Sequence, residues 1–324
     1  MKFLILKTTS PYVNLATEEY LFKNLNDDVF MLWQNEPSII IGKNQNAFAE
    51  INMDYAKENN LHIVRRITGG GAVYHDLGNV NYTFISTRSE RGGIDFEHFT
   101  LPIIESLKTL GIDAKLSGRN DLTVDDRKFS GNAQHTVGDR VLHHGTLLFD
   151  GNLDILTSAL NVDEEKLKAK AVKSVRSRVV NLKTIINRDI DVNQFIKIIS
   201  DFVISKFNPE IISAPNPDEI ESIVKRNESD EWIYPDRVFL SDYTVTKKKK
   251  YPFGLVQMNL NMSNYKIKEI KIFGDFFGSR EISELEDIIK GHSVSEIENL
   301  LQNISVNDYI FGMSNDLFSE HIKM

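Results

Sequence analysis

The residue types best suited to anion chemistry lie together near residue 70. Two arginines precede three consecutive glycines, and a histidine and an aspartate follow, in the run Arg65-Arg66-Ile67-Thr68-Gly69-Gly70-Gly71-Ala72-Val73-Tyr74-His75-Asp76. Glycine has no Cβ, so backbone N–H groups can approach a carboxylate or a phosphate closely. Arginine offers a fork of donors to the same anion. The run therefore predicts an anion-binding loop, with a plain turn between strands as the alternative.

β-branched and aromatic residues at 61–64 and 80–85 predict strands on both sides of this glycine loop. Two familiar phosphate loops do not match it. No Gly-Lys-Ser/Thr follows at the Walker spacing, and Tyr74 stands where a dinucleotide-binding fingerprint needs its third glycine.

A lysine follows in a polar turn, Asp126-Arg127-Lys128-Phe129-Ser130-Gly131. A fixed ammonium at Lys128 could bridge a carboxylate and a phosphate as negative charge develops, whereas an ordinary solvated lysine is the alternative. Asp121 and Asp76 could hold the Mg²⁺ that accompanies a nucleotide, or they could cap backbone N–H groups in turns.

Two adjacent histidines, His143 and His144, precede Gly145 and Thr146. Adjacent residues on a strand point to opposite faces, so the pair cannot easily chelate one ion. No HExxH pattern is present, and we expect one of the two histidines to pack toward the pocket. The basic run 173–178 is either a solvated face or a segment that closes over a phosphorylated ligand.

Composition excludes several classes of protein. The chain has 324 residues and no cysteine, which removes disulfides, cysteine metal sites and a thiol nucleophile. A net charge of −8 argues against non-specific nucleic-acid binding. No apolar run is long enough to span a bilayer, and the N-terminus does not match a signal peptide, so we expect a cytoplasmic protein without a membrane partner.

Periodicity predicts both helices and strands. Helical spacing appears at 14–22, 99–110, 154–160 and 192–207, and strand patterns at 29–33, 39–42 and 145–149, with a hairpin across 122–129. Polar residues at about 226–250, ending in four lysines, predict a linker. Beyond it, a hairpin at 255–273 and helices at 283–290 and 295–301 predict a small α+β domain.

Five motifs in one order resemble the lipoate–protein ligase family, namely 65–76, 117–122 (Ser-Gly-Arg-Asn-Asp-Leu), 126–131, 143–148 and 173–178. The resemblance covers essentially the whole chain. It implies an α+β fold, in which a biotin/lipoate ligase-like catalytic domain has a mixed β-sheet with flanking helices. This domain would span 1–245 and end in the linker, and a small α+β accessory domain would span 251–324.

The resemblance also implies an activity. The family activates lipoate with ATP and Mg²⁺ to lipoyl-AMP, releasing pyrophosphate, and then transfers the lipoyl group to one lysine of an acceptor domain. Implied acceptors are E2 subunits of 2-oxoacid dehydrogenases and the glycine-cleavage H protein, in a pathway of lipoate salvage. The enzyme itself is expected to be a monomer.

Site residues carry over by position. Lys128 would be catalytic, touching both the lipoate carbonyl and the α-phosphate, and Asp121 would hold Mg²⁺. ATP or lipoyl-AMP would contact Arg66, Gly71, Ala72, Val73, Tyr74, Asn79, Asp121, Lys128, Thr146 and Arg176. The lipoyl chain would contact Trp33, Thr68, Gly69, Gly70, His75, Lys128 and His144.

Alternatives stay open at this point. Transferases that carry the acyl group on an enzyme thioester need a cysteine, which this chain lacks. A lipoyltransferase that uses preformed lipoyl-AMP and a non-catalytic lipoate-binding sensor would share most of the motifs. Biotin ligases have a different arginine-glycine pattern.

Overall fold

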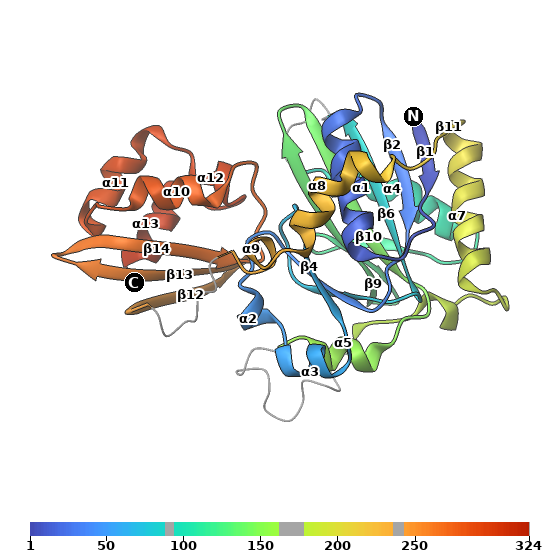
Figure 1. Cartoon of the computed structure of the whole chain (residues 1–324), viewed down its shortest axis with the longest axis horizontal. Helices are drawn as coiled ribbons and strands as arrows, with labels where there is room; N and C mark the ends of the chain where they lie inside the picture. Colours follow the sequence, from blue (N-terminus) through green and yellow to red (C-terminus); the bar gives the residue numbers. More distant parts are fainter. Residues whose placement is uncertain (88–93, 162–177, 236–242, 324) are drawn as a thin grey trace.

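The structure is a computed structural model that describes residues 1–87, 94–161, 178–235 and 243–323. A larger N-terminal part and a smaller C-terminal part lie next to each other, and the chain passes once from the first to the second (Figure 1). Among the described residues, no helix is long and apolar enough to cross a membrane.

An eight-stranded mixed sheet forms the centre of the larger part. Strand β1 pairs in parallel with both of its neighbours, and the other neighbours pair antiparallel. In spatial order the strands are β11 (Glu210–Ile211), β1 (Lys2–Ile5), β2 (Val29–Trp33), β6 (Asn79–Thr87), β10 (Arg140–Leu148), β9 (Arg127–Val137), β8 (Asp121–Val124) and β7 (Lys115–Ser117). Together with the helices described next, this sheet confirms the expected α+β class.

Helices cover both faces of this sheet. On one face, α4 (Phe96–Lys108) and α7 (Val192–Phe207) bury an aromatic core that includes Phe30, Phe84 and Phe149. On the other face, α1 (Pro11–Asn24) packs its leucines against β2. Ser10 caps α1, and Pro11 begins it, because proline's fixed φ suits the first helical turn. Helices α8 (Pro217–Glu228) and α9 (Asp230–Ile233) follow, and α8 packs along α1.

A second, three-stranded sheet lies on the α1 side and carries the glycine loop. Its order is β4 (His62–Arg65), β3 (Ser38–Ile41) and β5 (Val73–His75). The glycine loop therefore connects β4 to β5, a strand of three residues that is too short to show a two-residue period in the sequence. Helices α2 (Ala47–Glu50), α3 (Met53–Glu58) and α5 (Leu153–Ala159) contribute to the apolar cluster beside this sheet.

The C-terminal part is an antiparallel sheet covered by short helices (Figure 1). Its strands are β12 (Val245–Tyr251), β13 (Gly254–Ser263) and β14 (Lys266–Gly274). The helices are α10 (Ile282–Ile289), α11 (Ile297–Leu300), α12 (Val306–Tyr309) and α13 (Asn315–Lys323), and they share one apolar core with the sheet. The 3-10 turns are η1 (Leu182–Thr184), η3 (Val294–Glu296) and η4 (Leu301–Asn303).

The expected linker at 226–250 is wrong for much of its length. Residues 226–228 end α8, α9 follows, and the four lysines at 247–250 belong to β12. These lysines pair with β13 at the edge of the C-terminal sheet. Lysines are common on edge strands because they discourage pairing with another chain, so their pattern looks polar although the backbone is a strand.

Other expected elements are confirmed. The helices expected at 14–22, 99–110 and 192–207 correspond to α1, α4 and α7, and the hairpin across 122–129 corresponds to β8 and β9. The hairpin at 255–273 corresponds to β13 and β14. These elements have long apolar patterns or turns with aspartate or asparagine, which are strong signals in a sequence.

Candidate active site

The sheet register places a row of side chains under the glycine loop. Trp33 on β2 lies opposite Asn81 on β6, and Asn81 lies opposite Thr146 on β10. Directly opposed residues in an antiparallel sheet project to the same face, and so does the residue two positions along each strand. His144 therefore shares the face of Thr146, whereas His143 packs on the other face against Phe99.

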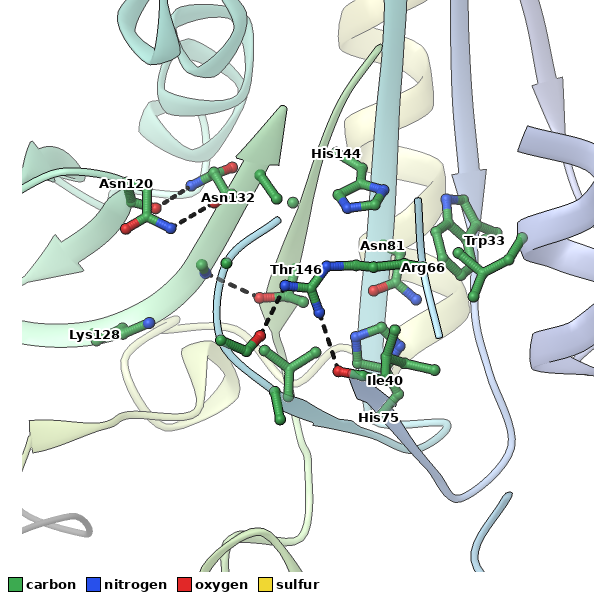
Figure 2. Close-up of a pocket in the computed structure, with 18 residues that line it drawn as sticks. Trp33, Ile40, Arg66, His75, Asn81, Asn120, Lys128, Asn132, His144 and Thr146 are labelled. Carbon is green, nitrogen blue, oxygen red and sulfur yellow. Dashed lines mark hydrogen bonds between the residues drawn. The ribbon is translucent and has the colours of Figure 1, made fainter. Parts of the chain in front are cut away.

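A cavity of about 110 Å³ lies over this row. Trp33 and Ile40 make one end of it apolar, and Lys128 and Asn120 lie at the other end (Figure 2). Of the residues expected to contact lipoate or the nucleotide, it is lined by Trp33, Arg66, Gly70, Gly71, Ala72, Val73, His75, Lys128, His144 and Thr146.

Arg66 shapes the glycine loop from inside. Its Nη2 donates to the carbonyl oxygens of Gly69 and Gly71, both at 2.8 Å, and its Nη1 donates to Ile40 O at 3.0 Å. Burial lowers the pKa of Arg66 to about 10, and the negative charge of Glu18 opposes that shift. The side chain is therefore charged at neutral pH and leaves a fixed positive charge in the cavity wall.

Arg65, unlike Arg66, does not line the cavity. Its guanidinium lies among backbone carbonyls, which accept from it at Gly42, Lys43, Gln45, Trp232 and Ile233. It therefore ties β4 to α9 and the loop after β3. Of the two arginines only Arg66 lines the cavity, since adjacent side chains at a strand end point to opposite sides.

The glycines allow close contacts on two sides of the loop. Gly70 has a φ of 91°, which favours glycine. A Cβ on Gly69 would collide with the Phe276 carbonyl of the accessory domain, and one on Gly42 would collide with the Gly70 carbonyl. Gly69 thus faces the accessory domain rather than the cavity.

A directed hydrogen-bond network runs behind the cavity. Arg66 Nε donates to Thr68 Oγ1 at 2.9 Å, so the Thr68 hydroxyl can donate to His144 Nε2, also at 2.9 Å. His144 Nδ1 then donates to the buried Glu18 carboxylate at 2.9 Å. Glu18 also accepts from Thr83 at 2.6 Å. These hydrogen bonds fix the orientations of the Thr68 and His144 side chains relative to each other.

His75 presents an N–H group to the cavity. Asn35 accepts from Asn14 through Oδ1 at 2.9 Å, so its Nδ2 must donate to His75 Nδ1, at 3.0 Å. This leaves the proton on His75 Nε2, which has no hydrogen-bond partner among the described residues. Burial lowers the pKa of His75 to about 3, and the charge of Arg66 lowers it further, so the ring is neutral.

Lys128 lies where two cavities meet. Its Nζ is 2.7 Å from Asp121 Oδ1, and its side chain lies over Gly131, where a Cβ would approach Nζ to 3.2 Å. A second cavity of about 390 Å³ shares Ala72, Val73, Lys128, Gly131 and Thr146 with the first. Tyr74 and Asn79, both expected at the nucleotide, line this second cavity.

Two expected site residues, Arg176 and Asp121, are not among the described residues that line the two cavities. Arg176 lies outside the described residues, and so does most of the basic run 173–178. Asp121 does not line either cavity directly but reaches the site through Lys128.

Sequence reasoning missed residues that the fold brings to the site. Glu18 and Asn14 come from α1, Asn81 from β6, and Asn120 and Asn132 from the β7–β8 turn and β9. Asn120 and Asn132 bond each other reciprocally, with Asn132 Nδ2 donating to Asn120 O at 3.0 Å. A polar residue inside an otherwise apolar strand, such as Asn81 before Tyr82, was the available signal.

The accessory domain touches this site through residues 274–277. Gly274 N donates to Asn44 O at 2.9 Å, and Phe277 packs against Phe96 with ring centroids 5.6 Å apart. Arg119, in the β7–β8 turn, donates to Asp275 O at 3.1 Å and to Phe253 O.

Two family models match the chain. The lipoyl protein ligase A/B catalytic domain matches residues 10–203, and the bacterial lipoate protein ligase C-terminus matches residues 241–322. The lipoate-protein ligase LplJ of Bacillus subtilis is 40% identical over 284 residues, covering 85% of each chain. Lipoate–protein ligase 1 of Staphylococcus aureus is 39% identical, covering 86% of this chain and 85% of its own.

Solved structures agree with these matches. Plasmodium falciparum LipL1 in complex with lipoate is 30% identical, with a TM-score of 0.77 over 94% of this chain and 95% of that one. A bi-partite lipoate protein ligase from Thermoplasma acidophilum, described with its E2 lipoyl domain, is 26% identical, with a TM-score of 0.63 over 72% of this chain and 95% of that one. The chain thus belongs to the lipoate–protein ligase family, a family of enzymes.

Proposed function

We propose that this protein is an ATP-dependent lipoate–protein ligase. It activates lipoate to lipoyl-AMP with release of pyrophosphate, and then transfers the lipoyl group to a lysine of an acceptor domain. The observation that carries this proposal is the meeting of two cavities at Lys128, one with an apolar end and one lined by the loop after the glycines. An acid and a nucleotide bound in these cavities would meet beside one ammonium group.

The first step joins two anions. A lipoate carboxylate oxygen attacks the α-phosphorus of ATP, the bond to the bridging oxygen breaks, and pyrophosphate leaves with the electron pair. Fixed positive charge and backbone N–H groups must offset the repulsion between carboxylate and phosphate. Arg66 and Lys128 supply the charge, and residues 71–74 supply backbone donors.

The second step forms an amide. A neutral acceptor amine attacks the acyl carbon of lipoyl-AMP, the bond to the phosphate oxygen breaks, and AMP leaves while the amine loses a proton. Lys128 stabilises the developing oxyanion and is not itself acylated.

Asp121 fits a role beside a magnesium ion that arrives with ATP. Its carboxylate is part-exposed and already lies 2.7 Å from a cation, Lys128 Nζ. Mg²⁺ usually takes one or two protein carboxylates and completes its shell with phosphate oxygens and water. Bound there, the ion would neutralise phosphate charge while Lys128 contacts the acid.

The acceptor is a lipoyl domain of an E2 subunit or the glycine-cleavage H protein. The structural relative from Thermoplasma acidophilum is described together with its E2 lipoyl domain, which supports this class of partner. Two other functions remain candidates on the same pocket, namely transfer from preformed lipoyl-AMP and lipoate sensing without catalysis. The accessory domain that contacts the glycine loop favours a complete ligase.

One experiment separates the three functions. The full chain is incubated with ATP, Mg²⁺ and lipoate, and pyrophosphate and lipoyl-AMP are measured before an acceptor domain is added. A ligase releases pyrophosphate and adds one lipoyl mass to the acceptor. A transferase modifies the acceptor only from supplied lipoyl-AMP, and a sensor does neither.

A further inference from the structure

Two buried polar groups at the apolar end of the lipoate cavity have no hydrogen-bond partner in the part of the chain that the structure describes. They are His75 Nε2 and Asn81 Nδ2, and both residues line the cavity beside Trp33 and Ile40. Their exposed fractions are 3% and 1%. Figure 2 shows them at the end of the cavity that is farthest from Lys128.

Hydrogen bonds to neighbouring residues determine which atoms of Asn81 and His75 direct an N–H group toward the cavity. Asn81 Oδ1 accepts from Asn79 Nδ2 at 2.9 Å, which turns its own Nδ2 toward the cavity. Asn35 occupies His75 Nδ1, which leaves the Nε2 proton for the cavity. Two unpaired donors in one small apolar chamber are costly in a folded protein, and buried polar groups usually have partners. A ligand that brings an acceptor would give both donors a partner.

We propose that His75 and Asn81 select acids whose far end carries a hydrogen-bond acceptor, the dithiolane sulfurs of lipoate, over the plain alkyl end of octanoate. The proposal rests on the proposed function, because the carboxyl end must lie at Lys128 for the far end to reach these donors. It assigns a role to Asn81, which lies outside the sequence motifs. It also predicts the relative affinities of two acids with the same chain length, lipoate and octanoate.

The physical basis is a difference between two ligand ends. Sulfur is a weak acceptor, but it is polarizable and gives each N–H group a partner. An alkyl end displaces solvent from the same N–H groups and leaves them unpaired. The free-energy cost of a buried unpaired donor is larger than the net gain from an ordinary hydrogen bond. Sites built to bond a polar group reject analogues that lack it. We expect lipoate to bind about ten-fold or more tightly than octanoate.

The test uses three acids and three variants. Dissociation constants are measured by calorimetry for lipoate, octanoate and 8-hydroxyoctanoate, which adds an oxygen acceptor to the alkyl end. The variants are Asn81→Leu and His75→Leu, which remove one donor each, and Asn259→Leu as a matched control, because Asn259 is equally buried but lies on β13, away from the cavity. The kcat/KM for acceptor modification is measured with the same acids.

In the wild-type protein, lipoate and 8-hydroxyoctanoate should bind more tightly than octanoate. Asn81→Leu and His75→Leu should each reduce the preference for lipoate at least three-fold, mainly through tighter octanoate binding, while Asn259→Leu should leave the ratio unchanged. Equal affinity of the wild type for lipoate and octanoate overturns the proposal. So does an unchanged ratio in both leucine variants.

Two features keep the result decisive. Asn81→Leu also removes the partner of Asn79, so His75→Leu and the wild-type ranking test the proposal even if the first variant does not fold. Binding is measured without ATP or acceptor, so a failure of ligation with the ranking intact counts against the proposed function, and a flat ranking with active ligation counts against this inference.

Discussion

Lys128 Nζ and Asp121 Oδ1 lie 2.7 Å apart across the β8–β9 hairpin, at the junction of the two cavities. The two side chains are 42% and 36% exposed, so solvent screens the pair and it adds little to stability. In the proposed reaction, this pair would hold the ammonium in place and leave it within reach of two anionic substrates.

Replacing Lys128 should therefore affect chemistry and not folding. We expect Lys128→Ala to lower lipoyl-AMP formation by at least about 10²-fold, the usual cost of removing one preorganised donor to developing charge. The unfolding free energy should change by less than about 0.5 kcal/mol. Both are measured directly, by mass spectrometry of the adenylate and by urea unfolding.

Lys183 offers a matched control. It pairs with Asp150 at 2.6 Å and is also 42% exposed, but it lines neither cavity. Lys183→Ala should leave adenylate formation unchanged. Full adenylate yield from Lys128→Ala would remove the role assigned to that lysine.

Glu18 and Glu19 are adjacent buried carboxylates with different partners. Glu18 accepts from His144 behind the cavity, whereas Glu19 accepts from Lys23 and from Arg226 on α8. We expect Glu18→Gln to raise the KM for lipoate, because the carboxylate that accepts from His144, and through it positions Thr68, loses its charge. Glu19→Gln should leave KM unchanged.

Both variants should lose stability: Glu18→Gln by about 1–3 kcal/mol, because its partners His144 and Thr83 are buried, and Glu19→Gln by less, because its partners Arg226 and Lys23 are 32% and 57% exposed. Steady-state kinetics and urea unfolding of the same preparations separate the two effects. An identical KM in the two variants would mean that Glu18 serves packing alone.

Arg119 joins the catalytic and accessory domains. Its guanidinium donates to two accessory-domain carbonyls, and its central carbon lies 4.7 Å from the centroid of the Phe277 ring. Arg119→Ala should weaken docking of the accessory domain by about 2 kcal/mol, the value of hydrogen bonds from a charged donor. The chain has no native cysteine, so spin labels at Leu101→Cys and Tyr265→Cys report the distance between domains.

The label distance should become broader in Arg119→Ala than in the parent. Arg280→Ala is the control, because Arg280 bonds Glu284 and covers Tyr309 inside the accessory domain. A distribution that does not change in Arg119→Ala would show that other contacts, such as the Lys43–Glu281 ion pair, are sufficient.

Acid should destabilise the fold through buried histidines. Burial lowers the pKa of His75 to about 3 and that of His143 well below its ordinary value. An unfolded histidine has a pKa of about 6.5, so the unfolded state binds more protons below that pH. The unfolding free energy should fall as pH drops below about 6.5, by up to about 1.4 kcal/mol per pH unit for each group, and for His75 the loss continues to about pH 3.

Urea unfolding at pH 7.5, 6.5 and 5.5 measures this slope. His143→Gln should be less stable at pH 7.5 but should show a shallower decline between pH 6.5 and 5.5, because one titrating group is gone. A wild-type stability that is flat over this interval contradicts the assignment.

The chemistry-bearing motifs were readable in the sequence because they depend on residue type and short spacing. Three glycines beside Arg66, a lysine in a tight hairpin at Lys128, and the lack of any cysteine are local facts that need no fold. Long apolar periods likewise located α1, α4 and α7 within three residues, as at 14 against 11 and 99 against 96.

Only the tertiary structure decided which of these residues act together. Arg65 and Arg66 look equivalent in the sequence, yet one holds backbone carbonyls near α9 and the other lines the cavity. Glu18 joins His144 only because α1 packs over β10, and Asn81 faces the cavity only because its register pairs it with Trp33 and Thr146. Residue type determines what a side chain can do, whereas strand register and packing determine which partner satisfies it and which polar groups are left for a ligand.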